Sequence, residues 1–348
     1  MKVLQLGPYP PPHGGVQSNL VAIRSFLLSR GIPCTVINIT RHRKLEADNI
    51  FYPKSTTDLL RLLITLEYDI VHLHIGGILS HRLLGLGLVC SSMPRRRSVL
   101  TFHSGGYPSS PAGKATKANS FAGFVLRRFN AVIGVNPEIM DFFSRLAVSD
   151  SRTHLIYPHS LSSEETRSPM PEPLASFFAA HHPVLISVGG LEAEYDVPLQ
   201  IDALGFVRNN FPDAGLIVVG SGSLEQDLRD GIRAQPHAAH ILLCGDIPHS
   251  FTLEAISRAQ AMLRTTLYDG DAISVREALH LGTPVIASDN GMRPAGVRLV
   301  PKSNLPALVT AIHEMLEHPT PRTAPAPADD SNLQAVLQVY EELLAGKA

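Results

Sequence analysis

The sequence is poor in several features that mark whole classes of protein. It has 3 cysteines, at Cys34, Cys90 and Cys244, which are far apart and lack metal-ligand spacing. That scarcity argues against a disulfide framework or a zinc site and favours a reducing compartment. Its 30 Lys and Arg residues are balanced by 31 Asp and Glu residues, so no excess of basic charge indicates nucleic-acid binding. Charged residues make up only 18% of the chain and hydrophobic ones 44%, which excludes a disordered protein.

Long apolar segments are also missing. The apolar positions at the N-terminus give way to Gly7 and Pro8, too early for the core of a signal peptide. The most apolar later stretch, residues 75–93, contains His81, Arg82 and four glycines. It is a poor match to a membrane span of ~20 apolar residues, and a buried helix is the better interpretation. We therefore expect a soluble, cytoplasmic protein.

Two series of alternating strands and helices share the 348 residues, a length more than twice the ~150 residues of a typical domain. Strands that alternate with helices of ten or more residues imply parallel pairing through βαβ crossovers. The first series has expected strands at 3–7, 34–39, 70–74, 98–102 and 131–135, with helices at 17–30 and 57–67. The second has expected strands at 184–188, 216–219, 241–244, 261–265 and 285–287, with helices near 198–209, 224–234, 251–257 and 274–280.

The two series predict an α/β protein with two Rossmann-like domains that face a cleft. The expected parts are a first domain at 1–165, a Pro-rich linker at 166–183, a second domain at 184–330 and a terminal helix at 331–348. Ligands of such folds bind beyond the carboxyl ends of the strands. The loops that follow the strands are therefore the places to look for chemistry.

Two such loops stand out in the first domain. Gly14 and Gly15 precede a helix, so the backbone can approach a ligand and the helix N-terminus favours anions; an ordinary turn is the alternative. No G-x-G-x-x-G fingerprint follows the first strand, which disfavours a dinucleotide-dependent oxidoreductase. His103 follows a later strand and could bond a sugar hydroxyl or orient a leaving group, or merely be bonded locally. His72 and His74 alternate along one strand and are expected to pack rather than act.

The most informative loop lies in the second domain, between a strand that ends near Thr265 and a helix that begins near Ser274. Asp269 and Asp271, with Glu277 on the helix, could bind several hydroxyls of a sugar and a ribose, and the amides at the helix start can hold phosphate oxygens. The alternative is a capping box, in which Ser274 and Glu277 only satisfy the helix end. A glycine turn at 220–222 is a weaker candidate, because short glycine turns end many Rossmann strands.

Together these pieces resemble the family 4 retaining glycosyltransferases, with their two-domain GT-B fold, over essentially the whole chain. The motifs that carry the resemblance are Gly14-Gly15-Val16, His103, Val188-Gly-Gly-Leu191, Val219-Gly-Ser-Gly222, Cys244-Gly-Asp246, and Tyr268-Asp-Gly-Asp271 with Glu277 and Gly282-Thr-Pro-Val285. Their order and spacing are specific, although no single piece is. The family's Glu-x7-Glu pair corresponds to Asp269 and Glu277, so the first acid is one methylene shorter.

The resemblance also exposes two departures. Family members carry an Arg and then a Lys early in the second domain, and both hold the donor diphosphate; this chain has Gly190 and Tyr195 there. Arg264, Arg276 and Arg293 lie near the acidic loop and could supply the charge, and Arg264, at the end of its strand, is the preferred substitute. Pairing of Arg264 with Asp269 or Asp271 is the alternative.

The resemblance implies a retaining, metal-independent hexosyltransferase for cell-surface polysaccharide or glycolipid synthesis. It would use a nucleotide-diphosphate sugar as donor and no cofactor, with a glycan or lipid-linked acceptor and no nucleic acid. The first domain would bind the acceptor, the second the nucleotide sugar, and the terminal helix would pack back on the first domain. An inactive nucleotide- or glycan-binding protein of the same fold is the alternative, and a metal at Asp269 and Asp271 is a less favoured hypothesis.

The implied roles, residue by residue, complete the hypothesis. His103, Asp269 and Arg264 are the expected catalytic residues. The expected donor-binding residues are Gly14, Gly15, Gly190, Gly222, Asp246, Ile247, Gly270, Asp271, Ala272, Ile273, Ser274 and Glu277, with Glu277 on the ribose and Asp246 and Ile247 at the base. Two basic runs, 41–44 and 95–97, could contact the inner face of the membrane; two solvated loops are the alternative.

Overall fold

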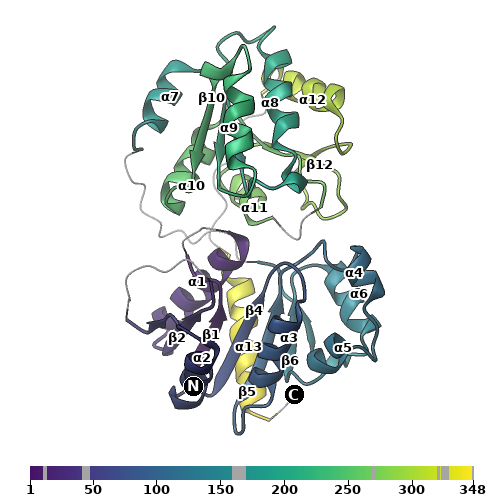
Figure 1. Ribbon diagram of the computed structural model, residues 1–348. Helices are drawn as coiled ribbons and strands as arrows, with labels where there is room; N and C mark the ends of the chain where they lie inside the picture. Colours follow the sequence, from purple (N-terminus) through teal and green to yellow (C-terminus); the bar gives the residue numbers. More distant parts are fainter. Residues whose placement is uncertain are drawn as a thin grey trace. The chain divides into compact units, whose positions relative to one another are not determined.

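A computed structural model describes residues 1–10, 14–40, 48–158, 170–268, 272–319, 322 and 329–346. The chain divides into two compact units, one of residues 1–159 and 330–348 and the other of residues 160–329. Each unit has its own parallel sheet with helices packed on it (Figure 1). The α/β fold class is thereby confirmed.

The sheet of the first unit has the strand order β3-β2-β1-β4-β5-β6-β7, and its neighbours pair in parallel. Its strands are β1 (Val3–Gly7), β2 (Cys34–Asn38), β3 (Ile50–Phe51), β4 (Ile70–Ile75), β5 (Arg97–Phe102), β6 (Ala131–Gly134) and β7 (Thr153–Leu155). Its helices are α1 (Gly15–Ser29), α2 (Thr56–Thr65), α3 (His81–Ser91), α4 (Pro111–Ala115), α5 (Phe121–Leu126), α6 (Pro137–Arg145) and α13 (Ser331–Leu344).

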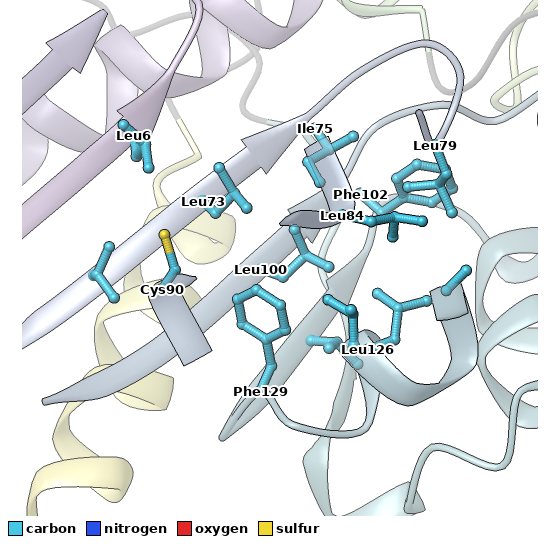
Figure 2. Packing of buried hydrophobic residues seen from close by; sticks show 14 of the residues in the cluster. Leu6, Leu73, Ile75, Leu79, Leu84, Cys90, Leu100, Phe102, Leu126 and Phe129 are labelled. Carbon is cyan, nitrogen blue, oxygen red and sulfur yellow. The ribbon is translucent and has the colours of Figure 1, made fainter. Parts of the chain in front are cut away.

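Alternation along these strands builds two hydrophobic layers. On one face, Leu73 and Leu100 of neighbouring strands pack against side chains of α2, α3, α5 and α6. Figure 2 shows part of this layer, with Leu126 and Phe129 beside the strands. On the other face, Val3 and its neighbours pack against α1 and α13. The terminal helix α13 therefore belongs to the core of the first unit, as the resemblance implied.

The sheet of the second unit has the order β10-β9-β8-β11-β12-β13, also parallel. Its strands are β8 (Val184–Val188), β9 (Gly215–Val219), β10 (Ile241–Gly245), β11 (Ala261–Arg264), β12 (Val285–Ser288) and β13 (Arg298–Val300). Its helices are α7 (Leu174–Ala180), α8 (Val197–Val207), α9 (Glu225–Arg233), α10 (His249–Arg258), α11 (Ile273–His280) and α12 (Leu305–Glu317). α7, α10 and α11 cover one face, and α8, α9 and α12 the other.

The expected linker at 166–183 needs correction where the structure describes it. Residues 174–180 form α7, and Leu174 and Phe177 are buried in the same cluster as Val184 and Ile217 of the second sheet. Pro173 directly precedes the helix, a position that proline tolerates. Residues 170–183 therefore belong to the second unit.

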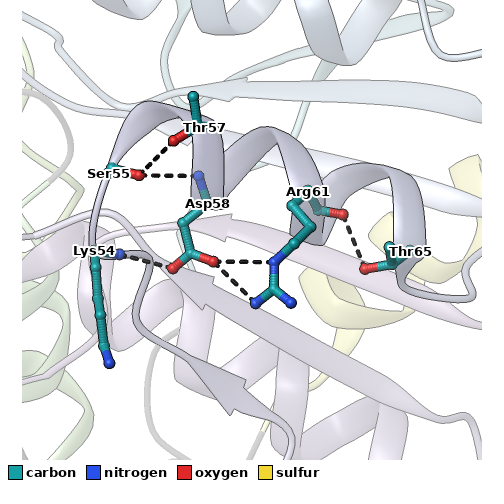
Figure 3. Close-up of polar contacts among 6 residues, drawn as sticks. All are labelled: Lys54, Ser55, Thr57, Asp58, Arg61 and Thr65. Atoms are coloured by element: carbon teal, nitrogen blue, oxygen red, sulfur yellow. Dashed lines mark hydrogen bonds and ion pairs between the residues drawn. The ribbon is translucent and has the colours of Figure 1, made fainter.

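Local sequence signals account for several helix ends. Ser55 caps α2: its side chain accepts from the Asp58 amide, while the Asp58 carboxylate binds Arg61 and the Lys54 amide (Figure 3). An acid in the first turn also suits the helix dipole. The cap at Ser55 therefore marks where α2 begins.

Candidate functional site

Each sheet reverses its strand order once, between β1 and β4 in the first unit and between β8 and β11 in the second. Ligands of doubly wound folds bind beyond the carboxyl ends of strands at such a switch point. In the second unit, β8 is followed by Gly189 and β11 ends at Arg264. The switch point therefore lies among residues that the sequence singles out.

Arg264 is a buried cation at this point. Its side chain is 6% exposed, and its Nη1 donates to the carbonyl of Val188 at 2.7 Å. Its guanidinium carbon lies 4.7 Å from the centre of the Tyr195 ring, a favourable cation–π contact. A Cβ atom on Gly189 would lie 2.5 Å from that Nη1 and equally close to the ring. Glycine at 189 is thus required for the guanidinium and the ring to meet there.

Tyr195 connects the two departures from the family pattern. It ends a short 3₁₀ turn, Ala193–Tyr195, that follows β8. A Cβ atom on Gly190 would lie 3.1 Å from its ring, so a long side chain at 190 would displace the ring from Arg264. Gly190 and Tyr195 are therefore coupled: the small residue makes room for the ring, and the ring packs on the buried arginine.

The glycine turn after β9 packs against the loop after β8. Gly220 has φ +133, and a Cβ atom there would lie 1.8 Å from the carbonyl oxygen of Gly189. A Cβ atom on Gly222 would lie 2.5 Å from the carbonyl oxygen of Leu191. These glycines allow two loops to touch backbone to backbone, which gives Gly222 a structural reason besides its expected donor contact.

Glu277 does not form a capping box with Ser274. Helix α11 begins at Ile273, its N-cap is Ala272, and no side chain caps it. Ser274 therefore lies inside the helix, and its hydroxyl donates to the Val188 carbonyl at 3.3 Å. Glu277 is 4% exposed, and its Oε1 lies 2.7 Å from Nε2 of His249, the first residue of α10. The carboxylate is held by a neighbouring helix, and the capping-box alternative is wrong.

The residues expected at the base lie after β10. Asp246 accepts from the Ser221 hydroxyl at 2.8 Å, and Ile247 packs partly buried on the cluster that holds Val219. This contact joins the loops that follow β9 and β10. Asp246 is thereby fixed beside the glycine turn.

The acidic loop itself, Asp269, Gly270 and Asp271, lies outside the described residues, so its expected roles stay predictions. Arg293 borders the same strand end: its Nε donates to the Ser288 carbonyl and its Nη2 to the Thr266 carbonyl at 3.1 and 3.4 Å. Two arginines thus lie near the carboxyl end of β11. Within the described ranges, no cluster of three His, Cys, Asp or Glu residues could hold a metal ion.

In the first unit, Gly14 is the N-cap of α1, with an extended backbone. A Cβ atom there would meet only the flexible Gln17 side chain, at 2.9 Å, so the fold does not demand glycine at 14. The first turn of α1 packs closely on the residue after β4, because a Cβ atom on Gly76 would lie 2.9 Å from the Val16 side chain. The start of α1, with Gly15, therefore lies beside the chain that leaves β4.

Three histidines form a group in the same unit, with His72 and His74 buried and His103 partly buried. His103 Nε2 lies 3.2 Å from His74 Nδ1, and the rings of His74 and His72 are 4.1 Å apart. Burial lowers the pKa of His72 and of His103 to about 3, and that of His74 well below its usual value. His103 is therefore a neutral imidazole near pH 7, suited to hydrogen bonding rather than to carrying charge.

The expectation that His72 and His74 pack is confirmed, since both are buried. His72 bonds Tyr340 and Thr101 at 2.5 and 2.7 Å. The sequence did not reveal that His74 is the partner of His103, or that His249 holds Glu277. Their contacts join different strands or helices, and no local spacing signals them.

Two family models match this chain and divide it between them. Glycosyltransferase Family 4 matches residues 13–159, and Glycosyl transferases group 1 matches residues 175–325. The chain belongs to the family 4 glycosyltransferases. The resemblance found in its motifs is thereby confirmed, and the chain is a divergent member.

Curated relatives match this family 4 chain only in part. Alpha-D-kanosaminyltransferase of Streptomyces kanamyceticus is 25% identical over 178 residues, 46% of each chain. Glycogen synthase of Mycobacterium tuberculosis is 29% identical over 154 residues, 41% of this chain and 37% of that protein. The match thus spans less than half the length of these relatives.

Solved structures match over nearly the whole length. HepE of Anabaena, in complex with UDP and glucose, has a TM-score of 0.68 and 18% identity and covers 99% of both chains. Sucrose-phosphate synthase of Thermosynechococcus elongatus has a TM-score of 0.72 and 16% identity and covers 99% of this chain and all of its own. At such identities the likeness establishes the fold, which is GT-B.

Proposed function

We propose that this protein is a retaining, metal-independent hexosyltransferase that moves a sugar from a nucleotide-diphosphate sugar to a hydroxyl acceptor. Its role would be in the synthesis of a cell-surface polysaccharide or glycolipid. One observation carries the proposal: the Val188 carbonyl accepts from both Arg264 and Ser274. A cation and the first turn of α11 are thereby held at the same backbone carbonyl, beside the point where the strand order reverses between β8 and β11.

This point suits a departing diphosphate. In the proposed reaction, the bond between the anomeric carbon and the donor phosphate oxygen breaks while the acceptor oxygen bonds to the same face. The acceptor proton passes to the departing phosphate. Negative charge grows on the diphosphate, so Arg264 and the amides of Ala272 and Ile273 stabilise the transition state more than the ground state.

The remaining roles follow the same geometry. Glu277, held by His249 through Oε1, keeps its other carboxylate oxygen for a ribose hydroxyl. Neutral His103, with Nε2 turned to His74, would use Nδ1 to contact the transferred sugar. The first unit would bind the acceptor. A nucleotide-sugar donor is supported by the similar fold of HepE, which was solved in complex with UDP and glucose.

A specific observation favours the second candidate, an inactive nucleotide- or glycan-binding protein. The ring of Tyr195 packs on Arg264 where relatives carry a lysine, and Gly190 replaces an arginine. A protein with this arrangement could bind the nucleotide and yet fail to neutralise a leaving group.

The test uses the full chain and a panel of UDP-, GDP-, ADP- and dTDP-sugars. We expect one nucleotide class to raise the melting temperature, to be hydrolysed slowly without an acceptor, and to release a sugar that keeps its anomeric configuration by NMR. We expect Arg264→Ala to lower turnover by ~100-fold, as for one lost transition-state donor. Arg233→Ala, a change at an exposed residue of α9, serves as control.

The outcomes separate the two candidates. Stabilisation without any turnover would favour the inactive binding protein. An inverted product would exclude the retaining mechanism, and near-normal turnover of Arg264→Ala would show that this arginine does not serve the diphosphate.

A further inference from the structure

The first unit contains a long stretch without acidic residues. Between Ile70 and Pro137 the sequence has no Asp or Glu and eight Lys and Arg residues, although the whole chain is almost neutral. The eight are Arg82, Arg95, Arg96, Arg97, Lys114, Lys117, Arg127 and Arg128. The positive and negative charges therefore balance over the whole chain but not within it, and this part of the first unit is strongly basic.

Two of the eight cations serve the fold. Arg96 lies over the ring of Tyr68 at 4.3 Å, and Nη1 of Arg127 donates to two backbone carbonyls at 2.7 Å. The other six are exposed: Arg82, Arg95, Arg97, Lys114, Lys117 and Arg128. As far as the structure describes the chain, none of these six forms an ion pair.

Exposed aromatic rings lie among these cations. Phe121 and Phe124 of α5 are 40% and 46% exposed, and their spacing of three places them on one side of the helix. The ring of His81, at the start of α3, stacks on Phe121, and the guanidinium of Arg128 lies 5.7 Å from the Phe124 ring. We call His81, Phe121, Phe124 and Arg128 the aromatic–basic strip.

The strip follows the outer side of the helix layer. α3 and α5 are neighbours on the sheet (Figure 1), and Arg128 reaches Ser92, just past the end of α3, at 3.3 Å. Ile78, three residues before α3, is 70% exposed. Apolar side chains that project from a basic surface are typical of binding at a membrane interface, where cations meet lipid phosphates and rings enter the acyl boundary.

We propose that the aromatic–basic strip docks on an anionic phospholipid surface. Arg82, Lys117 and Arg128 would contact head-group phosphates, and Phe121 and Phe124 would enter the interface. A nucleic acid fits less well, because His81 and Arg128 already occupy one face of each ring, and bases need open ring faces for stacking. This surface is independent of the donor site proposed above. Among the described helices, none is long and apolar enough to cross a bilayer.

Vesicle sedimentation with the full chain tests the proposal. We expect binding to vesicles of phosphatidylcholine mixed with phosphatidylglycerol, little binding to phosphatidylcholine alone, and release by salt. The double variants Phe121→Ser/Phe124→Ser and Lys117→Gln/Arg128→Gln should each bind about tenfold more weakly or worse. The matched controls Phe206→Ser and Lys302→Gln change exposed residues of the second unit and should bind like the unchanged protein.

Three results would overturn the proposal. They are equal binding to both kinds of vesicle, equal losses in the controls, and full displacement from vesicles by a single-stranded oligonucleotide, which would indicate a nucleic-acid surface. Circular dichroism melts confirm that each variant is folded. If a serine variant does not fold, Arg128→Glu alone replaces it and should weaken vesicle binding at least as much as Arg128→Gln.

Discussion

Glu277 is buried in the second unit, 4% exposed and 2.7 Å from His249. If it binds ribose, Glu277→Gln should weaken nucleotide binding by ~10- to 100-fold, the worth of a hydrogen bond to a charged group. The amide still offers His249 an acceptor, so the free energy of unfolding should fall by only ~1 kcal/mol. Calorimetric titration and denaturant unfolding measure the two effects, with Glu254→Gln as control. A loss of stability without a loss of affinity would make the residue purely structural.

Gly190 and Tyr195 should behave as a pair, because the ring occupies the space that a side chain at 190 would enter. We expect Gly190→Arg alone to lower the free energy of unfolding by ~1–3 kcal/mol through overpacking. Combined with Tyr195→Lys, which restores the family pattern, the same change should cost clearly less, so that the double-mutant cycle is non-additive. Denaturant unfolding of the four proteins measures this coupling; additive losses would mean that the ring and residue 190 are independent.

Helix α13 packs in the first unit, although almost the whole sequence separates it from the first strand of that unit. Tyr340 is fully buried, and its hydroxyl lies 2.5 Å from Nδ1 of His72 on β4. Tyr340→Phe leaves that nitrogen without its partner, which should cost ~1–3 kcal/mol of unfolding free energy. Tyr107→Phe is the control, because the Tyr107 hydroxyl bonds Thr116, which is only partly buried. Equal stability losses in both variants would show that the contact does not anchor α13.

Most elements of regular pattern were predicted within a few residues of their observed ends, but α6, α12 and the shortest strands were missed. β3, β7 and β13 have only two or three residues each, too few for a period of two to appear. They are strands because a neighbouring strand offers its backbone groups. The proline-rich stretch hid α7 because Pro171 and Pro173 directly before it indicate an irregular chain, although most residues of the helix are apolar.

The free energy of unfolding of the whole molecule should fall in mild acid, and the first unit should unfold first. His72, His74 and His103 have pKa values lowered by burial, to about 3 for His72. Because the unfolded chain binds these protons near pH 6.5, stability is complete above that pH and is lost as pH falls from 6.5 toward 3. For His72 alone the loss is about 1.4 kcal/mol per pH unit.

Calorimetry and limited proteolysis between pH 7 and 4 check this prediction. Peptides from residues 1–159 should appear before those of the second unit. In His72→Asn, which cannot titrate, the dependence on pH should be flatter. Equal melting temperatures at pH 7 and 5 would contradict the prediction.

Apolar periodicity was enough to predict two α/β units and the strands after which Arg264, Gly189 and His103 lie. The family was predicted by the resemblance of the loop motifs. Such signals are local, since a strand or helix is specified largely by which of its own faces is buried. The choice of side-chain partners was not predictable from them.

The hydrogen-bond partners of a side chain depend on which distant segments the fold brings together. Arg264 meets Val188, 76 residues away, and Tyr340 meets His72 across 268. Because the N-cap of α11 is Ala272 and not Ser274, the alternative of a capping box is wrong, and Glu277 instead bonds His249 of another helix. Residue types and their order decided which strands and loops form. The packing of distant segments decided which polar and charged side chains meet, because a hydrogen bond needs its two atoms within ~3 Å of each other.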